Sequence, residues 1–447
     1  MGDPRVLNRP HGAADTDSDP ALGGLRAPLD RLQEGRGERN RASSVDKRVQ
    51  GKRVAPRATR AGAAFLALAV AAAAVMGLGP ATVAALFGDA ASVPSNSFAS
   101  ASCWAAVKSL QKGTAVNSAN GTQTIGITAV DPAKSFLIFN TRSSSDRPVA
   151  AQIRGRIASS TTIEFARNTD EGSPAEINIQ WYVVEYPCGV NVQRGETTLS
   201  STVQDVPITP VGSLSRAFTT WSKTSFASDT TTDDNDEIVA ELTSTSNLQL
   251  RTNVAASDVV WWQVIEFTSA ADINVQRGTT AMLGAAMSAT ITIPTPVDTS
   301  KTFILVSFQT SGQGVDIGAR MLRAELTNSS TITVDRAVSG TPDDITEIFW
   351  QAIELTGASV RRGTESFASG TAQRAVGLTP SVDTARTVAF SSVELPGGAS
   401  GGSAPYVTDD VQGVASFTAA VSASQLTLDR DSTVSSADVG WFVVQLR

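Results

Sequence analysis

The clearest pattern along the chain is a short run in which a tryptophan precedes apolar and β-branched residues. The first run extends from Trp181 to Glu185, and its odd and even positions would face opposite sides of a strand. The run returns at Trp262, Trp350 and Trp441. Because a tryptophan recurs at one position in every copy, we predict that these rings lie in the core of each repeat. The alternative is an exposed stacking platform for sugars.

A second marker has the same period. Gln-Lys-Gly ends at Gly113, and its counterparts end at Gly195, Gly278 and Gly363, 82 to 85 residues apart. Between markers lie about six short alternating runs separated by turn residues, and no helical pattern is seen after residue 90. The sequence therefore predicts an all-β chain of four tandem antiparallel β-sandwich repeats of about 84 residues, each folding nearly independently. The predicted repeats are 104–188, 189–270, 271–356 and 357–447.

The N-terminal part has a different composition. Residues 1–60 are rich in arginine and lack apolar periodicity, which predicts a disordered basic region. Residues 61–88 contain no charged residue, and the basic segment before them fits a signal or membrane-anchor helix. Either a signal peptide is cleaved near Ala90, which we favour, or the helix remains as an anchor. Residues 89–103 are predicted to be a linker. Both alternatives place the repeats outside the cytoplasm, in the extracellular space or at the cell surface.

Charge and composition exclude several functions. The net charge is −7 although residues 1–60 are basic, so the repeats are acidic and unsuited to binding nucleic acid. The only histidine is His11, so the repeats cannot build a Ser-His-Asp triad. We expect no enzymatic activity and no cofactor.

Two cysteines and one acidic loop are the remaining candidates for site chemistry. Cys103 and Cys188 flank the first repeat, and in an exported protein we predict a disulfide between them; the alternative is two unpaired core residues. The loop Asp233–Glu237 could supply oxygen ligands to calcium. Because its acidic residues do not recur at one position in the other repeats, we expect a solvated loop and no metal site.

Charged residues recur where one repeat meets the next. The tryptophan run ends in Glu185, Glu266 and Glu354, and the following repeat opens with Arg194, Arg277 and Arg362. The final copy has no successor and carries Gln445 instead of the glutamate, and the first carries Lys112 instead of the arginine. We predict that each glutamate pairs with the arginine of the next repeat and fixes the angle between repeats. The alternative is coincidence.

The order of strands within a repeat carries a resemblance. An aliphatic strand is followed by Arg154–Phe165, with its Arg-Gly-Arg-Ile start, and then by the Ile-x-Ile-x-Trp-x-Val-Val run that ends at Val184. Over about two-thirds of each repeat this order resembles the H-type lectins. The resemblance implies six-stranded sandwiches that bind sugars and associate as trimers. No sugar-binding residue of that family can be placed on this sequence.

These observations predict an exported or membrane-anchored protein that is not an enzyme. Its expected function is multivalent binding or adhesion, with glycans or cell-surface proteins as candidate partners. The alternative is a structural envelope or appendage protein in which the repeats are spacers. A carbohydrate-active enzyme is the third hypothesis.

Overall fold

The computed structural model describes residues 105–168, 175–227, 229–312, 317–339, 344–396 and 412–447. The predicted basic region 1–60, hydrophobic helix 61–88 and linker 89–103 lie outside these residues. Within the described ranges, no helix has the length and apolar character needed to cross a membrane.

The described residues form an all-β structure of eight antiparallel three-stranded sheets. Four of them, here called inner sheets, each have a tryptophan strand in the centre. In chain order along the sequence, their strands are β1 (Ser109–Asn117), β3 (Ser135–Ser143) and β6 (Ile177–Glu185); β7 (Val190–Thr198), β9 (Ala217–Thr224) and β12 (Val259–Phe267); β13 (Ile273–Met282), β15 (Thr302–Thr310) and β18 (Ile345–Leu355); β19 (Ser359–Phe367), β21 (Thr387–Glu394) and β24 (Ala437–Gln445).

The other four sheets, here called outer sheets, contain the remaining strands. They are β2 (Gly121–Gly126), β4 (Arg154–Ser159) and β5 (Thr162–Arg167); β8 (Val203–Pro207), β10 (Val239–Ser244) and β11 (Asn247–Arg251); β14 (Ser288–Thr292), β16 (Arg323–Asn328) and β17 (Thr331–Asp335); β20 (Gln373–Gly377), β22 (Thr418–Val421) and β23 (Gln425–Asp429). We call β1–β6 group 1, β7–β12 group 2, β13–β18 group 3 and β19–β24 group 4. The same strand order, first-sixth-third and second-fifth-fourth, occurs in every group.

Short helical turns lie between some of the strands, although the sequence predicts no helix after residue 90. The α-helical turns are α3 (Pro148–Ala151) and α4 (Ile317–Arg320), and the 3-10 turns are η1 (Pro132–Lys134), η2 (Leu214–Arg216) and η3 (Gln412–Ala415). At four residues or fewer they are too short to leave a periodic apolar pattern in the sequence.

The tryptophan strands are buried on both faces. In β6, Trp181 and Val183 pack with Ile163 and Phe165 of the outer sheet, in a core that belongs to group 1 alone. The opposite face carries Tyr182, which packs into a second core. A strand that is apolar on both faces is typical of a sheet between two layers.

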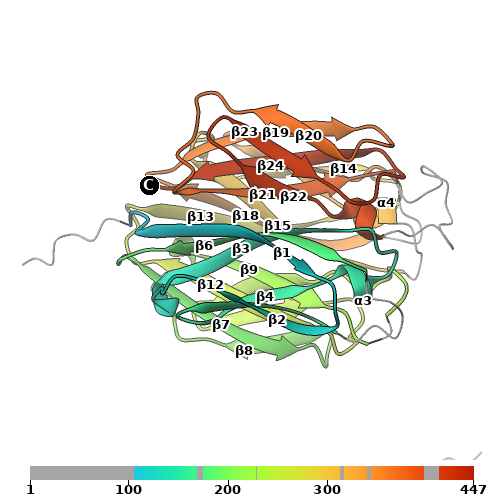
Figure 1. Cartoon of the computed structure of the whole chain (residues 1–447), viewed down its shortest axis with the longest axis horizontal. Coiled ribbons are helices and arrows are strands. Elements are labelled where there is room, and N and C mark those ends of the chain that lie inside the picture. The colour runs from blue at the N-terminus through green and yellow to red at the C-terminus, as the bar shows by residue number, and fades with distance from the viewer. Residues whose placement is uncertain (1–104, 169–174, 228, 313–316, 340–343, 397–411) are drawn as a thin grey trace, which may run out of the picture. The chain divides into compact units, whose positions relative to one another are not determined.

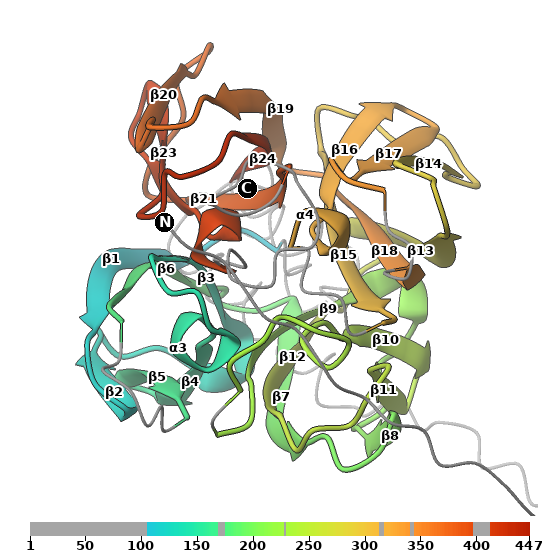
Figure 2. The same ribbon diagram turned by 90° about the vertical axis from the view of Figure 1, so that its right-hand side faces the viewer.

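That second core is shared by all four groups. Figure 2 shows the groups arranged around a common centre, and the shared core there contains Phe136, Phe218, Phe303 and Val388 from the third strand of each inner sheet. The described residues accordingly belong to one compact unit. The expectation that each repeat folds nearly independently is therefore wrong, because burying this face requires the neighbouring groups.

The two sequence markers meet across the inner sheets. Gly113 lies opposite Trp181 in the β1–β6 pairing, and the other marker glycines lie opposite Trp262, Trp350 and Trp441. A Cβ atom at residue 113 would lie 2.6 Å from Cζ2 of Trp181, well inside van der Waals contact. Glycine recurs at this position because the indole ring lies against the backbone there.

The predicted ion pairs between neighbouring groups are not the contacts that join them. The strand-end carboxylates and the Gln445 amide oxygen accept a backbone N–H from a turn of their own group. The donors are Asp131 for Glu185, Gly212 for Glu266, Asp298 for Glu354 and Asp383 for Gln445. Gln445 can replace glutamate in group 4 because this contact requires an oxygen acceptor but does not require a charge.

The arginines bind the same turns from the next group. Arg194 donates to the carbonyl oxygens of Pro132 (2.7 Å) and Ser135 (2.5 Å). Arg277 makes the equivalent contacts with Leu214 and Ala217. Arg362 likewise binds the carbonyl of Thr299, but its second contact is the carbonyl of Leu326 on β16. Glutamate and arginine thus hold one turn from two sides through its backbone, and they need not touch each other.

A buried glutamine also joins group 3 to group 2. Gln351 accepts from the N–H of Thr219 (3.0 Å) and donates to its carbonyl (3.1 Å). Thr219 lies on β9, which is an edge strand because it pairs only with β12 in its sheet. The Gln351 amide therefore makes hydrogen bonds to backbone groups on the open edge of that sheet. Gln263 makes the same pair of contacts with Leu137 between groups 2 and 1.

Group 4 contacts group 1 and closes the ring. The Tyr182 hydroxyl donates to the carbonyl of Ala419 (2.7 Å), and Arg142 forms an ion pair with Asp431 (3.0 Å). Groups 3 and 4 are joined by an ion pair between Arg323 and Glu394 (3.2 Å).

Candidate functional site

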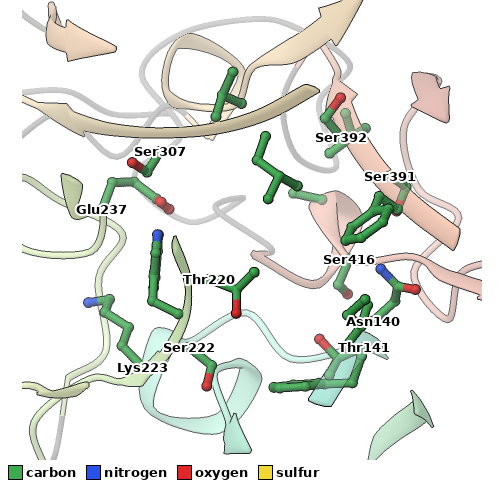
Figure 3. A pocket seen from close by; sticks show the side chains of 18 of the residues that line it. Asn140, Thr141, Thr220, Ser222, Lys223, Glu237, Ser307, Ser391, Ser392 and Ser416 are labelled. Atoms are coloured by element: carbon green, nitrogen blue, oxygen red, sulfur yellow. The ribbon is translucent and has the colours of Figure 1, made fainter. Parts of the chain in front are cut away.

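A cavity of about 490 Å³ lies where the four groups meet. The third strand of every inner sheet contributes to its wall, together with residues of α3 and η3 and with Met321 and Leu322, which follow α4. This volume is within the range of small-molecule sites in proteins. Figure 3 shows side chains of β3, β9, β15 and β21 around one space.

Strand alternation brings polar residues to this space. On β3, Phe136 and Ile138 face the shared core, so Asn140 lies on the same face two positions further on. Ser222, Ser307 and Ser392 have the same register position on β9, β15 and β21. All four line the cavity.

Aromatic rings close the shared core next to the cavity. Phe136 contacts Phe218 with ring centroids 6.4 Å apart, and Phe218 contacts Phe303 at 6.2 Å. Phe303 stacks on Phe390 at 5.0 Å, and Phe390 also lines the cavity. The cavity therefore has an apolar side and a polar wall.

One part of the wall is ionic. Lys223 of β9 is 3% exposed and donates to Asp258 (2.5 Å) and to the carbonyl of Asn235 (3.0 Å). Asp236 is also buried, 3.9 Å from the same ammonium group, and it accepts from the N–H of Asp233 (2.8 Å). The loop expected to be solvated is thus folded inward, because a lysine and backbone donors offset the burial of its carboxylates.

The carboxyl groups around Lys223 have raised pKa values. Burial raises the pKa of Asp229 to about 8, and the neighbouring Asp236 adds to the shift. Burial likewise raises the pKa of Asp236 to about 6 and that of Glu237 to about 8. Burial disfavours the charge of Lys223, but Asp258 and Asp236 outweigh it and raise the lysine pKa. Lys223 therefore stays charged while nearby acids retain protons.

These shifts predict that the protein loses stability as pH rises from about 4 to 8. In this window the unfolded carboxyl groups have lost their protons, whereas the folded Asp229, Asp236 and Glu237 still hold theirs, so rising pH favours the unfolded state. We expect Tm, measured by circular dichroism, to fall between pH 5 and 8. Asp229→Asn should flatten this fall.

The control for this prediction is Asp205→Asn. Asp205 is exposed, and its pKa is lowered by hydrogen bonds from Asn247 and Gln249, so its stabilising effect is lost only as pH falls below about 4. This variant should keep the wild-type slope between pH 5 and 8. A wild-type Tm that rises over that range would contradict the assignment.

The residues singled out from the sequence lie away from the cavity or support its walls. The four tryptophans are 4–8% exposed and pack in cores, so they form no exposed platform. Cys188 is disulfide-bonded, but Cys103 lies outside the described residues, and their pairing stays a prediction. Among the described residues, no three His, Cys, Asp or Glu side chains are placed to hold a metal ion.

Sequence reasoning missed the cavity residues and the joining glutamines. A signal for the first was present: Asn140, Ser222, Ser307 and Ser392 each lie four positions after the first apolar residue of the marker strand. The dipeptide Trp-Gln at Trp262 and Trp350 was a signal for the second. Neither pattern says what the side chains face, because that depends on how the groups are arranged.

Comparison with known proteins provides no family for this fold and site. No protein-family model matches the chain, and no curated protein is significantly similar to it.

Proposed function

We propose that each six-stranded group is one β-sandwich repeat and that four repeats form a ring around a ligand-binding cavity. The recurring strand order supports four equivalent repeats. The core of group 1 supports the sandwich, since it joins Leu137 and Val183 of the inner sheet to Ile157 and Phe165 of the outer sheet. Groups 2 and 4 have cores of the same kind.

The proposed function is non-enzymatic binding of a small ligand by an exported or membrane-anchored protein. The observation that carries this proposal is the cavity of about 490 Å³, to which every group contributes. Glycans remain the leading ligand class, and adhesion is the role that glycan binding would serve. The ring offers one central site, which fits one ligand per chain better than multivalent binding.

Contacts between the first and the last group favour a binding role over a spacer role. β1 enters the ring beside the C-terminal strand, where the N–H of Val107 donates to the carbonyl of Arg447 (2.8 Å). Figure 1 shows this end of the ring opposite α3, whose Ala151 lines the cavity. A string of spacer repeats would not require contacts between groups 4 and 1, so we favour binding over a spacer role.

The test is a fragment screen by native mass spectrometry on the full-length protein and on Ser391→Trp. Ser391 lines the cavity, and group 2 carries Trp221 at the same register position, so the larger ring should be tolerated while it fills the space. We expect fragments that bind the wild type one to one and lose at least tenfold in affinity in the variant.

The matched control is Ser244→Trp, at the exposed end of β10. It should bind fragments as the wild type does. The absence of any one-to-one complex with the wild type, or equal binding by Ser391→Trp, would contradict the proposal.

A further inference from the structure

The polar wall of the cavity contains a ring of four side chains at one register position. Asn140, Ser222, Ser307 and Ser392 come one from each group, and Figure 3 shows them around the same space. We call these four residues the polar ring. Three of them are serines, and Asn140 is the exception.

The three serine oxygens are held in place by neighbouring strands. Ser222 Oγ accepts from the N–H of Gly155 (3.0 Å). Ser307 Oγ and Ser392 Oγ accept in the same way from the N–H groups of Ala240 (3.3 Å) and Ala324 (3.0 Å). A hydroxyl also has a hydrogen to donate, and within the described ranges none of these three hydroxyls donates a hydrogen bond. The polar ring therefore presents three positioned donors.

Asn140 supplies the opposite hydrogen-bonding character. Its Oδ1 atom is buried and has no hydrogen-bond partner in the described part of the chain. The same is true of Oε1 of Gln412, which also lines the cavity. A buried carbonyl oxygen without a partner costs about 1–3 kcal/mol, which a ligand donor would recover.

The cavity wall offers no unpaired charge to a ligand. Lys223 is its lysine, and the ammonium group is already bound to Asp258. Burial raises the pKa of Glu237 to about 8, so this carboxyl group is mostly protonated at neutral pH. Because an ion would be desolvated here without a free counterion, the site favours a neutral ligand.

We propose that the cavity binds a neutral polyhydroxylated ligand of monosaccharide or disaccharide size, and that the polar ring recognises it. The three serines donate to ligand oxygens and Asn140 accepts from a ligand hydroxyl. Hydroxyl groups fit this site because each is both a donor and an acceptor. Asn140 breaks the equivalence of the four positions, so it selects one orientation of the ligand. This inference rests on the proposed function of the cavity.

The experiment measures binding to the full-length protein by calorimetry. The probes are neutral hexoses, N-acetylhexosamines, lactose and sorbitol, with hexuronic acids, glucosamine and cyclohexanol for comparison. We expect at least one neutral polyol to bind one to one, and the charged sugars and cyclohexanol to bind at least tenfold more weakly. Asn140→Leu and Ser392→Ala should each weaken the binding of that polyol at least tenfold.

Two further variants separate recognition from folding. Ser244→Ala, outside the cavity, should leave binding unchanged. Asn140→Ser creates a hydroxyl like those of the other groups and tests the ring if Asn140→Leu does not fold, as judged by circular dichroism. This variant should still bind polyols but with a changed preference among the stereoisomers.

Three results would overturn the inference. The first is that no neutral polyol binds, and the second is that charged sugars bind as tightly as the neutral ones. The third is that folded Asn140 and Ser392 variants bind with the affinity of the wild type. If fragments still bind and Ser391→Trp still blocks them, the proposed function stands and only the ligand class is wrong. If the fragments also fail to bind, both proposals fail.

Discussion

Gln351→Met is expected to lower the free energy of unfolding by about 2–6 kcal/mol. The side chain is 4% exposed, and its amide satisfies the N–H and the carbonyl of Thr219. Methionine keeps the volume but can replace neither hydrogen bond, and both contacts are buried. Each would be left buried and unpaired, at about 1–3 kcal/mol apiece. The measurement is urea unfolding followed by tryptophan fluorescence.

The chain offers a matched control in Gln276. Its amide makes the same pair of hydrogen bonds, to the carbonyl and N–H of Thr295, at 2.7 and 2.8 Å. These contacts are exposed, so water can replace the lost amide. We expect Gln276→Met to cost less than about 1 kcal/mol. Equal losses in both variants would show that burial of the joint between groups 2 and 3 is not what makes Gln351 important.

Gly113→Ala is expected to cost about 1–3 kcal/mol, although alanine usually suits a strand better than glycine. The new methyl carbon would lie 2.6 and 2.9 Å from two atoms of the Trp181 ring. The ring belongs to the close-packed core of group 1, so it cannot move without disturbing Phe165 and Val183. Thermal and urea unfolding both measure the loss.

Gly126→Ala is the control, since a Cβ atom there would meet nothing within 4 Å. Its stability should remain within about 0.5 kcal/mol of the wild type. A double-mutant cycle with Trp181→Phe tests the cause, because the smaller ring should relieve part of the clash. Strictly additive effects, or a Gly113→Ala protein as stable as the wild type, would exclude the proposed contact.

The strands could be predicted from the sequence because their signals are local. Alternation, turn residues and the paired markers Gly113 and Trp181 depend on neighbours in one sheet. The shared core could have been suspected, since Tyr182 and Val184 make the second face of β6 as apolar as the first. A tandem array of independent repeats was inferred instead, because no local pattern encodes the angle between two groups.

The predicted ion pairs between neighbouring groups were wrong for a chemical reason. From the sequence, the replacement of Glu354 by Gln445 at the equivalent position indicates the loss of a charge. The structure uses both side chains as oxygen acceptors for a turn N–H, a role that their chemistry shares. The cavity was beyond prediction, because it exists only where Asn140 and three serines from distant segments converge.

The ion pair that closes the ring has a consequence for how four similar groups find their order. Glu394 and Arg142 occupy the same register position in groups 4 and 1, but their charges are opposite. Glu394 meets Arg323 of group 3, whereas Arg142 meets Asp431 of group 4. If group 1 docked too early on group 3, Arg142 would approach Arg323, and like charges would repel.

Misassembly between similar neighbours is a characteristic failure of repeat-containing chains. The contacts made through backbone atoms, such as those of Arg277 and Gln351, do not distinguish one neighbour from another, because every group offers the same carbonyl and N–H groups. The reversed charge at residue 142 does distinguish them. It disfavours a three-membered ring with group 4 left outside and favours closure only after all four groups are in place.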